Sequence, residues 1–275
     1  MKPFGLSRRS VLGLFSAAAA PLPAAPTRVG FRLGVCSYSF NAFQRRLAIS
    51  MMKELRVHYA SVKDFHLPYS STPEEIKRAR AAFEKAGITI VSGGTIYLQD
   101  EDPAALRKYF EYARRCGMPM MVAAPTRATL PAVEKLAREF DIQVAIHNHG
   151  PEDPHFPTPK SVLDAVNGRD PRMGLCMDLG HSLRTGADVV EELARAGTRL
   201  LDVHIKDLES PKDKKSQCDV GQGVMPVAAI FRQLQKMNYQ GCVNLEYEIN
   251  GDNPLPGMMH SFGYMRGVLA GMAAA

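Results

Sequence analysis

Four ionisable side chains stand at or near the ends of apolar runs in the second half of the chain. They are two histidines, an aspartate and a glutamate: His147, Asp178, His204 and Glu246. If the runs are parallel strands of a barrel, their carboxyl ends meet at one mouth, where such groups are costly unless paired or coordinated. Two imidazoles and two carboxylates suit Mn²⁺ or Zn²⁺ better than Mg²⁺ or Ca²⁺. The pattern predicts one divalent metal, with separate salt bridges as the alternative.

Eight apolar runs of strand length must position these groups. Each is almost continuously apolar and then ends in polar residues, as is typical of parallel strands buried on both faces. The runs are residues 31–37, 59–64, 89–93, 119–124, 143–148, 173–178, 201–206 and 242–248.

Helical patterns separate these runs. They lie near residues 43–56, 72–87, 102–117, 129–140, from 158 onward, 187–197, 225–238 and 257–272. The alternation predicts an α/β fold, a single (β/α)8 TIM barrel. A doubly wound open sheet is the alternative, but no G-x-G-x-x-G sequence follows the first strand.

The first residues have the pattern of a targeting signal. Arg8 and Arg9 precede a short apolar run from Val11 to Ala20, which is followed by small residues and prolines. The run is too short to span a bilayer, and paired arginines are typical of twin-arginine export. We expect residues 1–27 to be a signal peptide and 28–275 the barrel. The mature protein would be periplasmic or otherwise exported by this route, with no membrane anchor; a cytosolic tail is the alternative.

Composition sets broad limits on the class of protein. The 275 residues are 45% hydrophobic and 23% charged, which is ordinary for a globular chain with a full core. Five cysteines without a C-x-x-C sequence do not form a disulfide framework. The formal charge of +6 is too scattered for a nucleic-acid surface, so we expect no nucleic-acid partner. Whether the chain forms a homo-oligomer stays open.

Motifs at the strand ends match a known family. Asp178 to His181 reads D-x-G-H, His204 to Asp207 reads H-x-K-D, and Glu246 stands in a final L-E pair. With these motifs, the chain after Thr27 resembles the sugar phosphate isomerase/epimerase family of xylose-isomerase-like TIM barrels. The resemblance implies a metal on Glu, Asp, His and Glu. The chain departs from this pattern at one position, because His147 stands where the epimerases have a glutamate. Inosose-dehydratase-like members have a similar histidine-rich end of strand five.

The resemblance also implies carbonyl chemistry on a keto sugar or sugar-like polyol. The metal would polarise the carbonyl, and a base would remove the neighbouring proton. Glu246, His149 and His181 are candidate bases, and Lys206 would hold the developing negative oxygen or an anionic group. Isomerisation or epimerisation is the main expectation. Loss of the strand-five carboxylate favours the alternative, a dehydratase or lyase that cleaves a keto-glycoside or inosose, and export favours an unphosphorylated substrate.

Other residues are candidate substrate contacts beside Lys206. Lys63 and His66 stand at the end of the second strand and are expected at the same mouth. Asp219 to Gly223 resembles the glycine-rich segment before the seventh helix of this superfamily, where the amide of Gly223 would meet the substrate.

Two rival classes remain. An abasic-site endonuclease of the same superfamily would need further ligands for three zinc ions, but strand four ends Ala123-Ala124-Pro125 and no D-x-H follows His204. A non-catalytic sugar-binding barrel is favoured by the His147 substitution. Retention of Lys206 and Glu246 argues against it.

Overall fold

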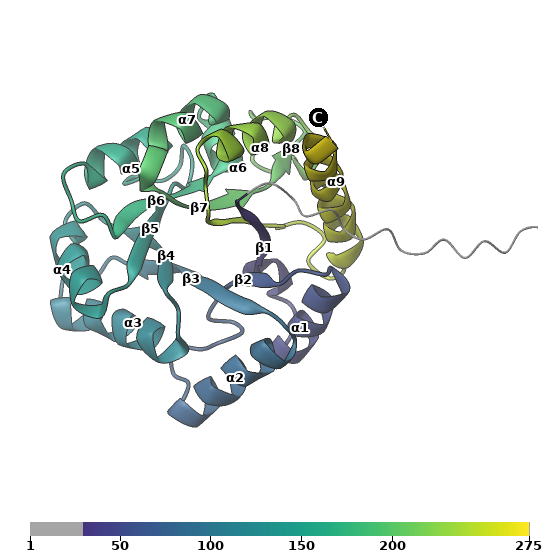
Figure 1. The fold of residues 1–275 in the computed structure, drawn as a ribbon. Coiled ribbons are helices and arrows are strands. Elements are labelled where there is room, and N and C mark those ends of the chain that lie inside the picture. The colour runs from purple at the N-terminus through teal and green to yellow at the C-terminus, as the bar shows by residue number, and fades with distance from the viewer. Residues whose placement is uncertain (1–29, 275) are drawn as a thin grey trace, which may run out of the picture.

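Eight parallel strands close into a barrel in the computed structural model, which describes residues 30–274 (Figure 1). Neighbouring strands follow the order β1-β10-β7-β6-β5-β4-β3-β2. Their bounds are β1 Arg32–Cys36, β2 Tyr59–Val62, β3 Thr89–Leu98, β4 Met120–Pro125, β5 Gln143–His147, β6 Met173–Asp178, β7 Leu200–Ile205 and β10 Cys242–Leu245. The predicted single (β/α)8 TIM barrel is confirmed. The predicted signal peptide lies outside the described residues.

Helices form the outer layer (Figure 1). They are α1 Arg45–Glu54, α2 Pro73–Lys85, α3 Pro103–Cys116, α4 Leu130–Phe140, α5 Pro159–Val166, α6 Leu179–Arg184, α7 Val189–Ala196, α8 Val227–Lys236 and α9 Leu255–Ala274, with 3₁₀ turns at Ser37–Phe40 and Gly197–Arg199. Local sequence explains several starts and ends. Thr72 and Glu75 form a reciprocal capping box at α2, and Gly117 ends α3 in the left-handed conformation, which glycine adopts without strain.

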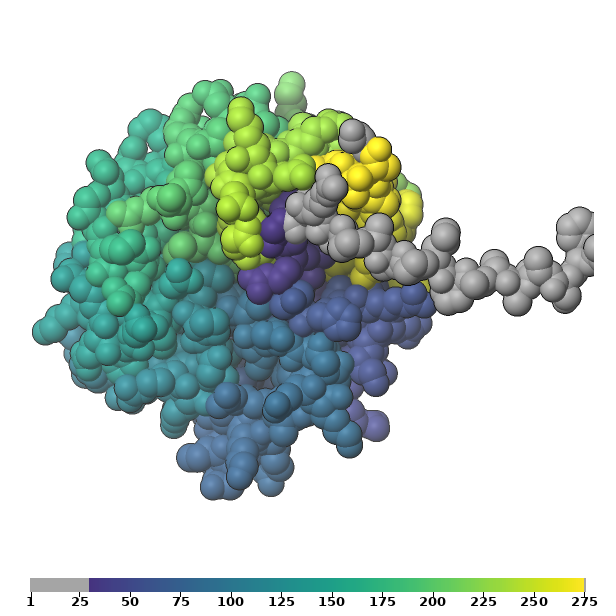
Figure 2. Space-filling model, viewed as in Figure 1, coloured from purple at the N-terminus to yellow at the C-terminus, as the bar shows by residue number. Residues whose placement is uncertain are grey.

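Apolar faces of the helices pack against the barrel wall and form the main core. Phe110 of α3 and Phe140 of α4, for example, are buried with ring centroids 5.7 Å apart. Figure 2 shows the same face with its side chains close-packed, and α2 projecting at the lower edge. Among the described residues, no helix is both long and apolar enough to cross a membrane. All five cysteines are buried and free.

The structure differs from the sequence expectation in four elements. β3 continues to Leu98, where the apolar run predicted an end at residue 93. A short helix, α6, follows β6 directly. After β7, strands β8 (Asp207–Leu208) and β9 (Gln217–Cys218) form a small antiparallel ribbon.

The first and last described elements share one end of the barrel. β1 begins at the amino end of the sheet, where the N–H of Arg32 donates to the carbonyl of Gly241. In α9, the Arg266 guanidinium donates to the carbonyls of Leu55 and Arg56, in the turn before β2. The helix therefore runs back from the mouth to the amino end.

Candidate metal centre and active site

The four predicted ligands converge at the carboxyl end of the barrel. His147 and Asp178 are the last residues of β5 and β6, His204 lies one residue before the end of β7, and Glu246 directly follows β10. One ligand atom from each of the four lies within 4.8 Å of the others, and all four side chains are buried. The convergence follows from the parallel strand order, which brings successive strand ends to one mouth.

Several ligand atoms of this cluster have no hydrogen-bond partner among the described residues. They are both ring nitrogens of His147, Oδ2 of Asp178 and Nδ1 of His204, and all four are buried. Three of them face other members of the cluster: His147 Nε2 lies 3.5 Å from Asp178 Oδ2, and His204 Nδ1 lies 3.4 Å from Glu246 Oε1. Buried polar atoms without partners are costly. The donor set of two nitrogens and two oxygens therefore fits a divalent ion such as Mn²⁺ or Zn²⁺.

Asp178 is held in place by its neighbours. Its Oδ1 accepts the N–H of His181 at 2.7 Å and caps α6, which leaves Oδ2 for the cluster. Asn148 ties β5 to β6, because its side chain accepts the N–H of Asp178 at 3.0 Å and donates to Ser182 Oγ at 3.1 Å. This network orients the carboxylate before any ligand binds.

Lys206 is a buried cation among three carboxylates. Its Nζ lies 3.2 Å from Asp178 Oδ2, 2.9 Å from Glu246 Oε2 and 2.5 Å from Glu248 Oε2. Burial alone would lower the lysine pKa, but these carboxylates raise it well above its ordinary value. In return, and against the effect of burial, Lys206 holds the pKa values of Asp178 and Glu246 below their usual range. Both carboxylates are therefore anionic.

A layer of polar residues lies behind His204, inside the barrel. Cys36 Sγ is 3.3 Å from His204 Nε2, and Asp202 Oδ2 is 3.8 Å from the same nitrogen. Burial raises the pKa of Asp202 to about 6, and Asn244 donates to its Oδ1 at 2.8 Å. These contacts on Nε2 leave Nδ1 of His204 for the metal cluster.

A pocket of about 160 Å³ opens onto the cluster. Its walls come from six strands and the segments that follow them: Tyr38, Lys63, Thr95, Tyr97, His147, His149, His181, Glu246 and Glu248. Burial lowers the pKa of His181 to about 4 and also lowers that of His149. Both imidazoles are therefore neutral near pH 7 and able to accept a proton.

His149 is flanked on two sides. Its Nδ1 lies 3.5 Å from Asp153 Oδ2, and its ring stacks on Tyr97 with centroids 6.4 Å apart. Lys63, a predicted substrate contact, also lines this pocket. Its ammonium donates to the Thr95 carbonyl and lies 3.4 Å from Asp64 Oδ1.

Three predicted substrate contacts do not belong to the pocket wall: His66, Lys206 and Gly223. Lys206 is held instead by its three carboxylates. His66 is buried, and its Nε2 lies 3.0 Å from the carbonyl oxygen of Phe43, so it joins the loop after β2 to the segment before α1. The amide of Gly223 donates to Asp207 Oδ2 at 3.1 Å. The glycine-rich segment thus folds around a carboxylate of its own chain instead of presenting this amide to the pocket.

Sequence reasoning missed four residues of the pocket wall. Glu248 lies two positions after Glu246, on the same side of an extended chain, and that spacing was a usable signal. Tyr38 comes directly after the first apolar run, residues 31–37, and that position was also a usable signal. Thr95 and Tyr97 had no signal, because the third apolar run ends at residue 93.

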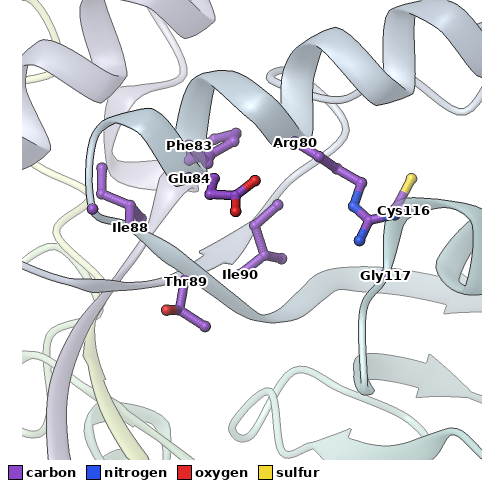
Figure 3. A pocket seen from close by; sticks show the side chains of 9 residues that line it. Arg80, Phe83, Glu84, Ile88, Thr89, Ile90, Cys116 and Gly117 are labelled. Carbon is purple, nitrogen blue, oxygen red and sulfur yellow. The ribbon is translucent and has the colours of Figure 1, made fainter.

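A larger cavity, of about 420 Å³, lies at the opposite end of the barrel. Figure 3 shows it between α2, the start of β3 and the end of α3, with Arg80 reaching toward Gly117. Its wall combines Arg80 and Glu84 with apolar side chains. The convergent ligands and the pocket histidines all lie at the other end.

The chain belongs to the xylose isomerase-like TIM barrel family, whose family model matches residues 54–268. A search of the curated proteins found no match to this chain.

Solved structures share the fold at low identity. The structure of D-psicose 3-epimerase with D-tagatose from Clostridium cellulolyticum H10 is 16% identical, with a TM-score of 0.72 over 87% of this chain and 99% of that one. The "probable 3-DHS dehydratase AsbF involved in the petrobactin synthesis" from Bacillus anthracis is 14% identical, with a TM-score of 0.71 over 85% and 99%. A xylose isomerase domain protein from Alicyclobacillus acidocaldarius is 18% identical, with a TM-score of 0.71 over 87% and 98%. At these identities the likeness establishes the fold alone.

Proposed function

We propose that the protein is a metal-dependent enzyme of the sugar isomerase/epimerase type, which removes a proton beside the carbonyl of a keto sugar or sugar-like polyol. One observation carries the proposal: four buried metal-type ligands lie within 4.8 Å of one another, and two of them, His147 and Glu246, line a pocket that two neutral histidines also line. A perturbed, convergent set of this kind at a barrel mouth is typical of an active site.

His147, Asp178, His204 and Glu246 would hold the ion, either Mn²⁺ or Zn²⁺. A bound ion would supply Lewis acidity that polarises the substrate carbonyl and acidifies the adjacent C–H bond. Glu246 contacts both His204 and Lys206 and has a lowered pKa, so it is a better ligand than base.

His149 is the preferred base among the candidates. Asp153 lies beside its Nδ1, which orients the ring and leaves Nε2 to accept the proton. His181 lines the same pocket and would return a proton to the neighbouring carbon. Lys206 keeps two ligand carboxylates anionic.

The charges of the pocket favour an unphosphorylated substrate. Lys206 is already neutralised by Asp178, Glu246 and Glu248, and Lys63 lies against Asp64 and a backbone carbonyl. Within residues 30–274, no arginine belongs to the wall, although arginine is the usual partner of a phosphate. A neutral keto sugar fits these charges better.

Elimination is the second candidate, as in a dehydratase or lyase that cleaves a keto-glycoside or inosose. It is favoured by His147, because a histidine at this position leaves two carboxylates, Asp178 and Glu246, among the four metal ligands. Two imidazoles would then remove the proton and assist the departing group. Products separate the two candidates, because only elimination yields a dehydrated or cleaved sugar.

Solvent exchange tests the proposal directly. The purified protein, loaded with Mn²⁺ or Zn²⁺, is incubated with unphosphorylated keto sugars in D₂O and followed by NMR. We expect deuterium to appear at the carbon beside the carbonyl, at a rate that falls to background in His204→Ala. Elemental analysis of both proteins should give about one metal per chain in the wild type and loss in the variant. A metal-loaded protein that exchanges no proton in any keto sugar would favour the non-catalytic sugar-binding barrel.

Export is a separate proposal, based on the Arg8-Arg9 pair and the apolar run after it. Fractionation of cells that express the full chain should place the shortened protein outside the cytosol, and Arg8→Lys with Arg9→Lys should retain it inside.

A further inference from the structure

A second hollow, of about 580 Å³, adjoins the pocket at the barrel mouth. Residues of the loop after β2, the end of β3 with the loop after it, and α3 line it. Four tyrosines line it: Tyr69, Tyr97, Tyr109 and Tyr112. We call this hollow the tyrosine groove.

Tyr97 belongs to both the pocket and the tyrosine groove. The residue is 55% exposed, although one side of its ring stacks on His149. A ligand in the pocket beside His149 is therefore next to the ring of Tyr97, which is also part of the tyrosine groove. The two hollows are neighbouring parts of one surface.

The tyrosine groove is preformed. The ring of Tyr69 packs edge-on against those of Tyr109 and Tyr112, with centroids 5.2 and 4.8 Å away. The Tyr112 hydroxyl donates to the carbonyl of Leu67 at 2.6 Å, which fixes the cluster to the loop after β2. Ligand binding would cost little ordering of these side chains.

The polar residues of the tyrosine groove are balanced in charge. Two acidic residues, Asp100 and Glu111, line it together with two basic ones, Lys108 and Arg115, and with the neutral Gln99. A groove of this kind does not select a phosphate or another polyanion. It offers hydroxyl, amide and charged groups for hydrogen bonds and aromatic faces for apolar C–H surfaces, which are the two needs of a neutral sugar ring.

We propose that the tyrosine groove is an outer subsite that binds the second unit of a glycoside whose first ring lies in the metal-bearing pocket. The inference rests on the proposed function and narrows its substrate class from free monosaccharides to glycosides. The pocket itself is small, at about 160 Å³, whereas the groove has about 580 Å³, so the larger part of the accessible space lies outside the catalytic floor.

Equilibrium binding tests the outer subsite without requiring turnover. The metal-loaded protein is titrated with methyl β-glucopyranoside, cellobiose and maltose, and binding is followed by saturation-transfer NMR and calorimetry. We expect at least one disaccharide to bind about tenfold more tightly than the methyl glucoside, a difference of about 1.4 kcal/mol. Tyr109→Ala, which changes the groove and not the pocket wall, should remove that advantage and leave methyl glucoside affinity unchanged.

Two further variants make the result specific. Gln99→Ala changes an exposed residue of the groove and should weaken disaccharide binding without affecting folding. Tyr264→Ala removes an exposed tyrosine of α9, across the barrel from α3 (Figure 1), and should keep the full advantage. The proposal is overturned if no disaccharide binds more tightly than the methyl glucoside, or if the advantage survives both groove substitutions. Proton exchange in a free keto sugar would still support the proposed function in that case.

Discussion

The carboxylate of Asp207 accepts backbone N–H groups from four residues: Leu208, Gly221, Gly223 and Met225. It is fully buried and connects the start of β8 to the loop that leads into α8. A Cβ at Gly223 would lie 2.3 Å from Asp207 Oδ1, which explains the glycine at that position. The H-x-K-D motif therefore contributes a loop anchor in addition to its histidine and lysine.

Replacing this anchor should cost stability. Asp207→Ala leaves buried N–H groups without an acceptor, at about 1–3 kcal/mol for each one that water cannot reach. We expect the free energy of unfolding to fall by roughly 3 kcal/mol or more, measured by urea denaturation. Asp213→Ala, in the exposed loop between β8 and β9, is the matched control. A change below about 0.5 kcal/mol in Asp207→Ala would contradict the anchoring role.

His149→Gln tests the base assignment. The substitution removes the imidazole but keeps a polar side chain, so kcat for proton exchange should fall by about 10²- to 10⁴-fold. The metal content should stay at the wild-type level, because His149 is outside the four-ligand cluster. His155→Gln in the same loop should leave both quantities unchanged. Equal exchange rates in wild type and His149→Gln would move the base role to His181.

The ligand cluster was predictable from sequence, because parallel strands bring their carboxyl ends together whatever their details. The contacts that each side chain makes were harder to predict from the sequence. Whether His66 turns toward the mouth or toward Phe43 depends on loop conformation, which strand periodicity does not encode. The same limit applies to Gly223, whose amide direction depends on the buried carboxylate of Asp207.

At the level of elements, strand starts were predicted better than strand ends. Apolar runs mark where β4 to β7 begin, but β3 continues beyond its apolar run through the half-buried Thr95 and the exposed Tyr97. Helix α6 begins directly at a metal-type ligand and has six residues, too few for a helical period to be visible. The unpredicted extension of β3 and helix α6 both contribute residues to the pocket wall.

An acidic residue of α4 links that helix to the turn after α5. Glu134 accepts the N–H of Asp170 at 3.0 Å and pairs with Arg169 at 2.8 Å and Arg138 at 2.9 Å. The backbone hydrogen bond, and then Arg169, lower the pKa of Glu134 below its ordinary value of 4.5, against the opposing effect of burial. The link is therefore an ionised one at neutral pH.

Acid should weaken this link. Because the pKa of Glu134 is lower in the folded state, its contribution is fully present above pH 4.5 and is lost as the pH falls below that value. Glu134→Gln should reduce the free energy of unfolding at pH 7 and flatten its decline below pH 4.5. Urea denaturation at several pH values measures both effects, with Glu84→Gln on α2 as the control. Parallel stability curves for wild type and Glu134→Gln would argue against the link.

For the molecule as a whole, metal binding should stabilise the barrel. The ligands come from β5, β6, β7 and the end of β10, so an ion held by all four joins separate parts of the sheet. A ligand at about 100 times its Kd adds about 2.7 kcal/mol to the folded state. At roughly 2–4 °C per kcal/mol for a chain of this size, Tm should rise by about 5–10 °C.

Calorimetry with and without a chelator measures that rise. His204→Ala should show little or no shift on metal addition, and His155→Gln should show the full one. An identical Tm for the chelated and metal-loaded wild type would mean that these residues do not hold the ion in the folded state.

The first and last described residues lie at the end of the barrel opposite the mouth. The start of β1 and the Arg266 contacts of α9 show this. A surface or resin attached at the end of α9 would therefore leave the pocket and the tyrosine groove turned toward solution. The same arrangement gives a sensor chip or a packed-bed reactor one uniform orientation of the protein, with the substrate approaching from the open side.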